Sequence, residues 1–111
     1  MKEESTQKNM LIELAQEYID FTKQTIPSYH IGNFGYTSYN NEKICIENYN
    51  NNTYNVDFKI LNFGKVTVCF EGNDPTIVTG LDRFKEEYLF KKLYEDAKIY
   101  LHGYLMPTKD L

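Results

Sequence analysis

Residues 33–71, NFGYTSYNNEKICIENYNNNTYNVDFKILNFGKVTVCFE, alternate apolar and polar side chains over most of their length. The apolar residues fall at even positions: Phe34, Tyr36, Ile44, Ile46, Tyr54, Val56, Phe58, Ile60, Val66, Val68 and Phe70. A period of two residues is typical of strands that bury one face and expose the other. The stretch therefore predicts a four-stranded antiparallel meander over about residues 33–71.

Three loops with asparagine would join these strands, and asparagine tolerates the left-handed backbone that tight loops need. Loops at 39–41, at 50–52 and at Asn62-Phe63-Gly64 all keep even positions opposite even positions. The last loop, with Gly64 left-handed, would place Ile60 opposite Val66 and Phe58 opposite Val68. By the same rule, the second loop pairs Ile46 with Val56 and Tyr49 with Thr53. The first pairs Tyr36 with Ile44.

Helical periodicity flanks the meander on both sides. Leu11, Leu14, Tyr18 and Phe21 recur at helical spacing and predict a helix over about 5–25, with Ser5 or Thr6 as its N-cap and Pro27 beyond its end. A second helix is predicted over about 80–102, with a capping box at Thr79 and Asp82 and an end at Gly103. Residues 76–79 before it form a connector, extended through Ile77 and Val78.

The second helix carries most of its apolar residues on one broad face, namely Leu89, Phe90, Leu93, Tyr94, Ala97, Tyr100 and Leu101. Leu81, Phe84 and Tyr88 fall off that face. The predicted fold is α+β: an N-terminal helix, a four-stranded antiparallel meander and a C-terminal helix, with both helices packed on one face of the sheet. At 111 residues, we expect one domain over 1–111.

Composition excludes several function classes. The net charge of −4 is spread along the chain, and no basic stripe is present to bind nucleic acid. No apolar run approaches the roughly 20 residues that span a membrane, and no signal peptide precedes the first helix, so we expect a cytoplasmic protein. The sequence predicts no cofactor, because it has no phosphate-binding glycine loop.

The expected register decides the chemistry of the odd face. It places Gly35, Cys45, Asp57 and Cys69 in one row across the sheet, and Asn33, Glu47, Asn55 and Glu71 in another. Cys45 and Cys69 would lie about 10 Å apart, too far for a disulfide or for a shared metal ion. Glu47 and Glu71 would be equally far apart on a flat face, which offers no cleft to raise either pKa for acid catalysis. We therefore predict no metal site and no enzyme activity.

These features favour a small cytoplasmic protein-binding module, an inhibitor or immunity-type protein that neutralises a partner protein such as a basic toxin or nuclease. Small acidic inhibitors, including the immunity proteins that neutralise nuclease toxins, share this general profile, but the chain carries no family motif. Among its ten tyrosines, some flank the loop tips, where tyrosine is common at interfaces. The predicted binding residues are Glu47, Tyr49, Asn55, Asp57, Lys59 and Glu71.

Two alternatives remain open. One is a small-molecule-binding protein or enzyme with a pocket between the sheet and the helices, rimmed by His30, Tyr88, Tyr94 and His102. The other is a homodimer that pairs along strand 65–71, which would end the meander and carries charge only near its ends.

Overall fold

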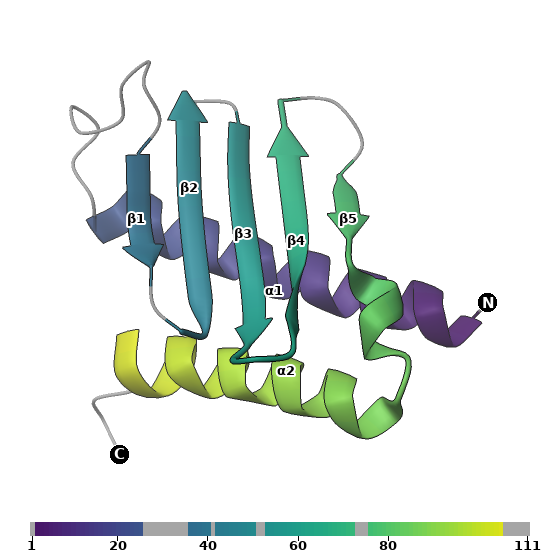
Figure 1. Ribbon diagram of the computed structural model, residues 1–111. Coiled ribbons are helices and arrows are strands. Elements are labelled where there is room, and N and C mark those ends of the chain that lie inside the picture. The colour runs from purple at the N-terminus through teal and green to yellow at the C-terminus, as the bar shows by residue number, and fades with distance from the viewer. Residues whose placement is uncertain (1, 26–35, 41, 51–52, 73–75, 106–111) are drawn as a thin grey trace.

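The computed structural model describes residues 2–25, 36–40, 42–50, 53–72 and 76–105. Four helical elements accompany five strands, and Figure 1 shows their arrangement. The two long helices are α1 (Lys2–Thr25) and α2 (Glu87–Ile99). A short 3₁₀ turn, η2 (Leu81–Phe84), precedes α2, and a π-helical turn, η3 (Tyr100–Leu105), follows it. The strands are β1 (Tyr36–Asn40), β2 (Ile44–Asn50), β3 (Thr53–Ile60), β4 (Gly64–Glu71) and β5 (Ile77–Thr79).

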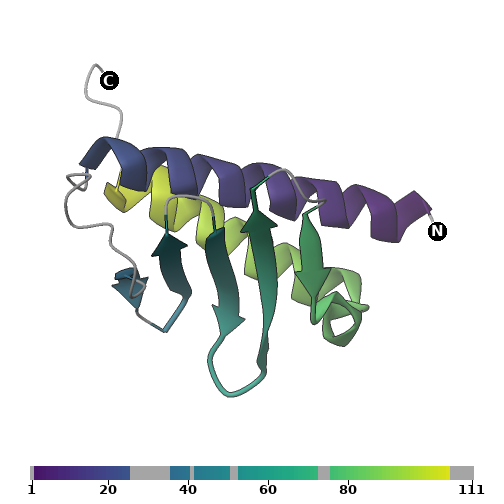
Figure 2. The ribbon, with the colours of Figure 1, turned by 90° about the horizontal axis from the view of Figure 1, so that it is seen from above.

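The strands form one antiparallel sheet in chain order, β1-β2-β3-β4-β5. The α+β class and the order of helix, meander and helix are confirmed. Both helices cross one face of the sheet and run in the same general direction (Figures 1 and 2). The four expected strands are present, and β5 adds a fifth, short one within the expected connector.

Strand β5 changes the interpretation of the β4 edge. Thr79, Val78 and Ile77 pair with Thr67, Val68 and Cys69 in the middle of β4. The expectation that β4 ends the meander was therefore wrong. The stretch that was expected to be open to a second copy of the chain is already paired.

Register agrees with expectation in the middle of the sheet and departs from it at the turns. Ile46 lies opposite Val56, as predicted. Phe58, however, lies opposite Val66 and not Val68, because the turn occupies Leu61, Asn62 and Phe63. Asn62, with φ 66°, is the left-handed residue there, so the prediction of Gly64 in that role was wrong. The shift is two residues, which keeps every side chain on its expected face.

Two register irregularities are not visible in the alternation. In β1, Tyr36 lies opposite Asn48, so the predicted pair with Ile44 was wrong, and the register changes between Thr37 and Tyr39. In β2, a second irregularity lies between Asn48 and Asn50. Thr53 therefore lies opposite Asn50, and its predicted pairing with Tyr49 was wrong. An extra residue on one strand breaks the parity on which the prediction depended. Asn33, Phe34 and Gly35 lie outside the described residues.

The core fills the space between the even face of the sheet and the helices. The even-position side chains of the central strands are almost wholly buried, namely Ile44, Ile46, Tyr54, Val56, Phe58, Val66 and Val68. The helices contribute Leu11, Leu14, Ala15, Tyr18, Ile19, Phe90, Leu93, Ala97 and Leu101. The expected faces of both helices are therefore the buried ones.

Tyr18 joins three elements within this core. Its side chain is wholly buried, and its ring meets that of Phe58 edge-on at a centroid distance of 5.9 Å. Its hydroxyl donates a hydrogen bond of 2.6 Å to the carbonyl oxygen of Ala97. Burial, followed by the nearby Tyr100 and Glu17, raises the pKa of the Tyr18 phenol far above its usual range.

The helix boundaries differ from those expected. α1 begins at Lys2, so an N-cap at Ser5 or Thr6 was wrong. The predicted helix over 80–102 is interrupted between η2 and α2, and η3 continues through Gly103 to Leu105. Leu81 and Phe84 fall off the main apolar face because they belong to η2, where both are buried.

Gly80 stands at the start of η2, where a capping box was expected. It has φ 91°, and no side chain caps the turn, so the predicted Thr79–Asp82 capping box was wrong. A Cβ atom at Gly80 would lie 2.5 Å from the carbonyl oxygen of Lys65. Only glycine permits both this backbone conformation and this close approach to β4.

η2 also holds the β3–β4 turn. Arg83 donates a hydrogen bond of 3.1 Å to the carbonyl oxygen of Phe63, and its guanidinium lies 5.6 Å from the centre of the Phe63 ring. That ring meets Phe84 edge-on at a centroid distance of 5.1 Å. The turn that sets the register of β3 and β4 is thus packed against an element about 20 residues further along the chain.

We expect Gly80→Ala to lower the free energy of unfolding by about 2–4 kcal/mol, because it adds both a strained φ and a backbone clash. Gly72→Ala is the matched control, since Gly72 has φ 57° but no atom within 4 Å of its added Cβ. That variant should lose only about 1–2 kcal/mol, the cost of the left-handed backbone. Urea unfolding of both variants gives the comparison, and equal losses would contradict the role of the contact with Lys65.

We expect Tyr18→Phe to lower the free energy of unfolding by about 1–3 kcal/mol at neutral pH, because it leaves the Ala97 carbonyl without its side-chain donor. The difference in the free energy of unfolding between the wild type and this variant should shrink above pH ~10 by about 1.4 kcal/mol per pH unit. The reason is that the Tyr18 phenol ionises at this pH in the unfolded state but not in the folded state. Unfolding curves at pH 8 and between pH 10 and 11 test this. Tyr88→Phe is the control, because Tyr88 is 68% exposed and should change neither quantity.

Candidate functional site: the open face of the sheet

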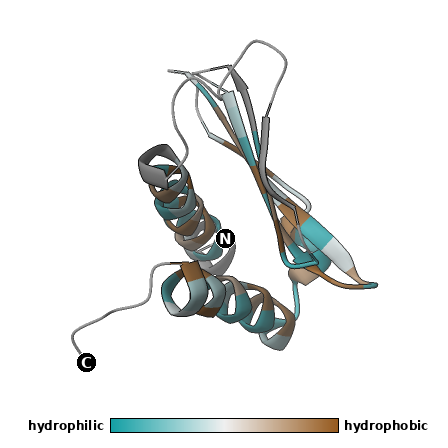
Figure 3. Cartoon of the chain, turned by 90° about the vertical axis from the view of Figure 1, so that its left-hand side faces the viewer, coloured by the Kyte–Doolittle hydropathy of each residue, from teal (hydrophilic) through white to brown (hydrophobic). Residues whose placement is uncertain are grey.

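The sheet has one covered face and one open face. Seen edge-on, both helices lie on the same side of the sheet, and no described helix or strand lies on the other (Figure 3). We call the open side the outer face and define it by the odd-numbered residues of the strands whose side chains are described. These are Cys45, Glu47, Thr53, Asn55, Asp57, Lys59, Lys65, Thr67, Cys69, Glu71, Ile77 and Thr79.

The observed register arranges these side chains in rows across the strands. One row is Cys45, Asp57, Thr67 and Thr79, and the next is Glu47, Asn55, Cys69 and Ile77. Lys59 lies opposite Lys65, and Glu71 lies opposite Thr53. The predicted rows were wrong on β4 by two residues, because the β3–β4 turn begins one residue earlier than expected.

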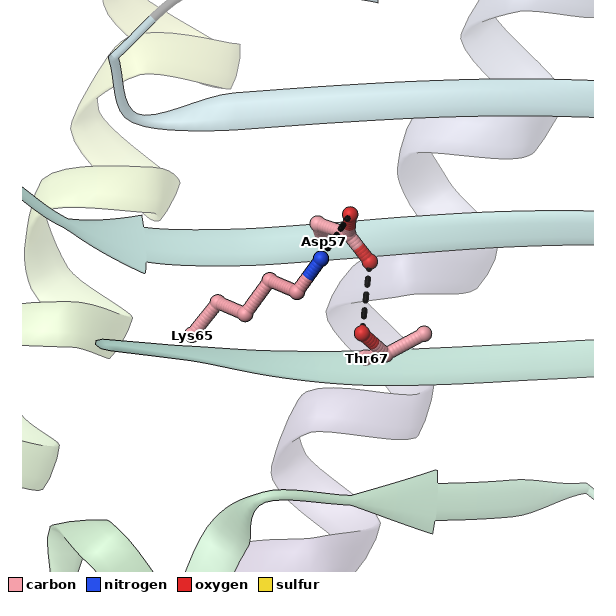
Figure 4. A network of polar contacts seen from close by, with 3 residues as sticks. All are labelled: Asp57, Lys65 and Thr67. Carbon is pink, nitrogen blue, oxygen red and sulfur yellow. Dashed lines mark hydrogen bonds and ion pairs between the residues drawn. The ribbon is translucent and has the colours of Figure 1, made fainter.

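Asp57 lies at the centre of the outer face (Figure 4). It is only 9% exposed, although no described element covers it. Thr67 donates a hydrogen bond of 2.7 Å to its Oδ1, and Lys65 places its Nζ 3.5 Å from its Oδ2. Two neighbours on β4 therefore hold the carboxylate in one position from the side.

Asn55 is two residues before Asp57 on the same face of β3. Its Oδ1 is buried and has no hydrogen-bond partner among the described residues. A buried acceptor without a donor costs free energy, and native proteins usually avoid it. Asn55 lies between Glu47 and Cys69, and neither residue supplies that donor.

The two cysteines are free and lie in different rows, on strands that β3 separates. Burial and then the negative charges of Asp57 and Glu47 raise the pKa of the Cys45 thiol. Burial raises the pKa of the Cys69 thiol as well, and so do the charge of Glu71 and a hydrogen bond of 3.7 Å from Cys69 Sγ to Glu71 Oε2. Both residues therefore stay protonated more strongly than an ordinary thiol, which makes them poor nucleophiles.

The structure brings most of the predicted binding residues together. Glu47, Asn55, Asp57, Lys59 and Glu71 all lie on the outer face. Glu47 and Glu71 do not share a row, so that expectation was wrong. Tyr49 belongs to β2, at the register irregularity, and its side chain lies outside the described residues. Sequence reasoning missed the roles of Lys65 and Thr67, which only the observed register places beside Asp57.

The residues of the alternative pocket do not gather at one site. Tyr94 stacks on Phe90 at 6.0 Å, and His102 lies 3.0 Å from a carboxylate oxygen of Glu17. Tyr88 points to solvent, and His30 lies outside the described residues. A hollow of about 440 Å³ does exist between the helices, lined by Thr6, Gln7, Met10, Lys85, Glu87, Phe90 and Lys91. It lies near the N-terminal ends of α1 and α2, not against the sheet.

Comparison with protein families, with curated proteins and with solved structures gave no significant match. No described helix is long and apolar enough to cross a membrane. Within the described residues, no group of three or more His, Cys, Asp or Glu side chains could hold a metal ion.

We expect the two thiols to respond separately to their neighbouring carboxylates. Glu71→Gln should lower the pKa of Cys69 and raise its alkylation rate at pH 8 about twofold, because it removes a nearby negative charge. Asp57→Asn should do the same at Cys45 and serves as the reciprocal control. Iodoacetamide labelling followed by peptide mass spectrometry measures both rates. An equal change at both cysteines in either variant would contradict the assignment.

Proposed function

We propose that this protein is a small cytoplasmic protein-binding module, of the inhibitor or immunity type, that neutralises a partner protein through its outer face. The observation that carries the proposal is the polar centre of that face. There the Asp57 carboxylate is nearly buried and fixed by Thr67 and Lys65, while no described element covers it. A binding group held in place before the partner arrives loses little entropy on binding.

The surroundings of Asp57 support the same role. Small side chains, Cys45, Thr67 and Cys69, lie near it, and longer charged side chains stand further out on the face. A partner that packs on these small side chains could reach the Asp57 carboxylate, and the longer charged side chains would form the polar rim that interfaces commonly have. The net charge of −4 would favour encounter with a basic partner, such as a nuclease toxin.

The raised thiol pKa values favour binding over nucleophilic catalysis on this face. A second candidate function is binding of a small molecule in the hollow of about 440 Å³ between α1 and α2. Its volume is in the range of known ligand sites, and Met10 and Phe90 give it apolar walls. The outer face remains the better candidate because its polar groups are already fixed.

A bulky substitution separates these possibilities. Cys45→Arg would place a long side chain beside Asp57, and Ile99→Arg adds the same side chain on α2, where Ile99 is 61% exposed. Both variants and the wild type are tagged, expressed in the native host, and captured with their bound proteins for quantitative mass spectrometry. We expect Cys45→Arg to lose the specific partner by at least about tenfold and Ile99→Arg to retain it.

Three outcomes would contradict the proposal. They are the absence of a specific partner, equal capture by Cys45→Arg and wild type, and loss of the partner only in Ile99→Arg. Circular dichroism confirms that each variant is folded. Met10→Trp, which would fill the hollow between the helices, tests the second candidate. If only this variant changes the ligands released from the protein on denaturation, the small-molecule function is favoured instead.

A further inference from the structure

Charges on the outer face are segregated along the strands. Lys59 lies opposite Lys65, and we call these two residues the lysine row. The acidic residues Glu47 and Glu71 lie nearer the other end of the strands. At about 3.3 Å per residue, six residues along β3 separate the lysine row from the level of Glu71 by roughly 20 Å.

This arrangement does not serve the stability of the sheet. Like charges directly opposite each other on neighbouring strands are destabilising, whereas alternating signs are stabilising. Asp57 offsets the charge of Lys65 at 3.5 Å, but the Lys65 side chain remains 59% exposed. Among the described residues, no carboxylate forms an ion pair with Lys59. The lysine row therefore presents positive charge to solvent at one end of the face.

The other end presents acceptors. Glu47 lies beside Asn55, whose buried Oδ1 has no donor among the described residues, and Glu71 lies one row further along the strands. A cationic side chain from a partner would be attracted by the two carboxylates. A small rotation of Asn55 would let that side chain donate to the amide oxygen and remove the cost of leaving it unpaired.

On the basis of the protein-binding role proposed above, we propose that the outer face binds a protein surface of opposite polarity in one fixed orientation. An acidic segment of the partner lies over Lys59 and Lys65, and a basic side chain of the partner lies over Glu47, Asn55 and Glu71. Complementary charge of this kind sets the register of a complex and rejects partners that approach in the reverse orientation.

Two synthetic decapeptides test the polarity of the face, one rich in glutamate and one rich in arginine, each titrated into the ¹⁵N-labelled protein at low salt. We expect the acidic peptide to shift the amide signals around Lys59 and Lys65, and the basic peptide to shift those around Glu47, Asn55 and Glu71. Lys59→Glu should lower the affinity for the acidic peptide alone, and Glu71→Lys should lower the affinity for the basic peptide alone, each by at least about fivefold.

Matched controls lie on the exposed side of α2. Lys98→Glu and Glu95→Lys make the same changes of charge away from the outer face and should leave both affinities within about twofold. The proposal is overturned if these controls weaken binding as much as the face variants, or if both peptides shift the same signals. Tighter binding of a thymidine decanucleotide than of the acidic peptide would overturn the choice of a protein as the occupant.

The two proposals fail separately. If Cys45→Arg abolishes capture of the partner but the peptides show no polarity, the protein-binding role stands and the fixed orientation is wrong. If the peptides bind as expected but Cys45→Arg retains the partner in full, the face has the charge pattern proposed here and is not the surface that binds that partner.

Discussion

The structure depends on burial of one face of an antiparallel sheet by two helices. Ile46, Val56 and Val68 at its centre have no exposed surface, and removal of such side chains from water is the main driving force for folding. Both long helices lie on this face. Because neither is left to cover the opposite face, the side chains there must be compatible with water, and the outer face is polar for that reason.

Tyr18 places a polar group inside this apolar layer and so fixes how the helices meet. Its hydroxyl bonds to the carbonyl oxygen of Ala97, in the last turn of α2. Three residues later, at Tyr100, the α-helix gives way to the π-helical turn η3. A side chain that inserts into the helical hydrogen-bond ladder is one known cause of local distortion in helices. The bond between α1 and α2 and the change of helix type thus lie within one helical turn of each other.

Alternation in the sequence predicts which face each central side chain occupies but not which side chains are neighbours. The face of a side chain depends only on whether its position is odd or even. The predicted faces are therefore correct even though the predicted pairing of β3 and β4 was wrong by two residues. The neighbours depend on the turn, where Asn62 and not Gly64 takes the left-handed conformation. Asp57 therefore lies beside Thr67 and not Cys69. At the irregularities in β1 and β2, odd positions come to lie opposite even positions. The pattern of apolar residues gives no sign of these irregularities.

In the complex proposed above, the centre of the outer face and its charged ends would make different contributions. Asp57 is desolvated and already bonded to Thr67, so its carboxylate has one position and little capacity to adapt. Such a group would discriminate between partners of the proposed complex, because a partner without a suitable donor would leave the carboxylate without solvent. The charges of the lysines and glutamates would act over longer distances and would govern the rate and direction of approach. A surface that combines the two can attract a partner from a distance and still reject it at contact, as the neutralising role proposed above would require.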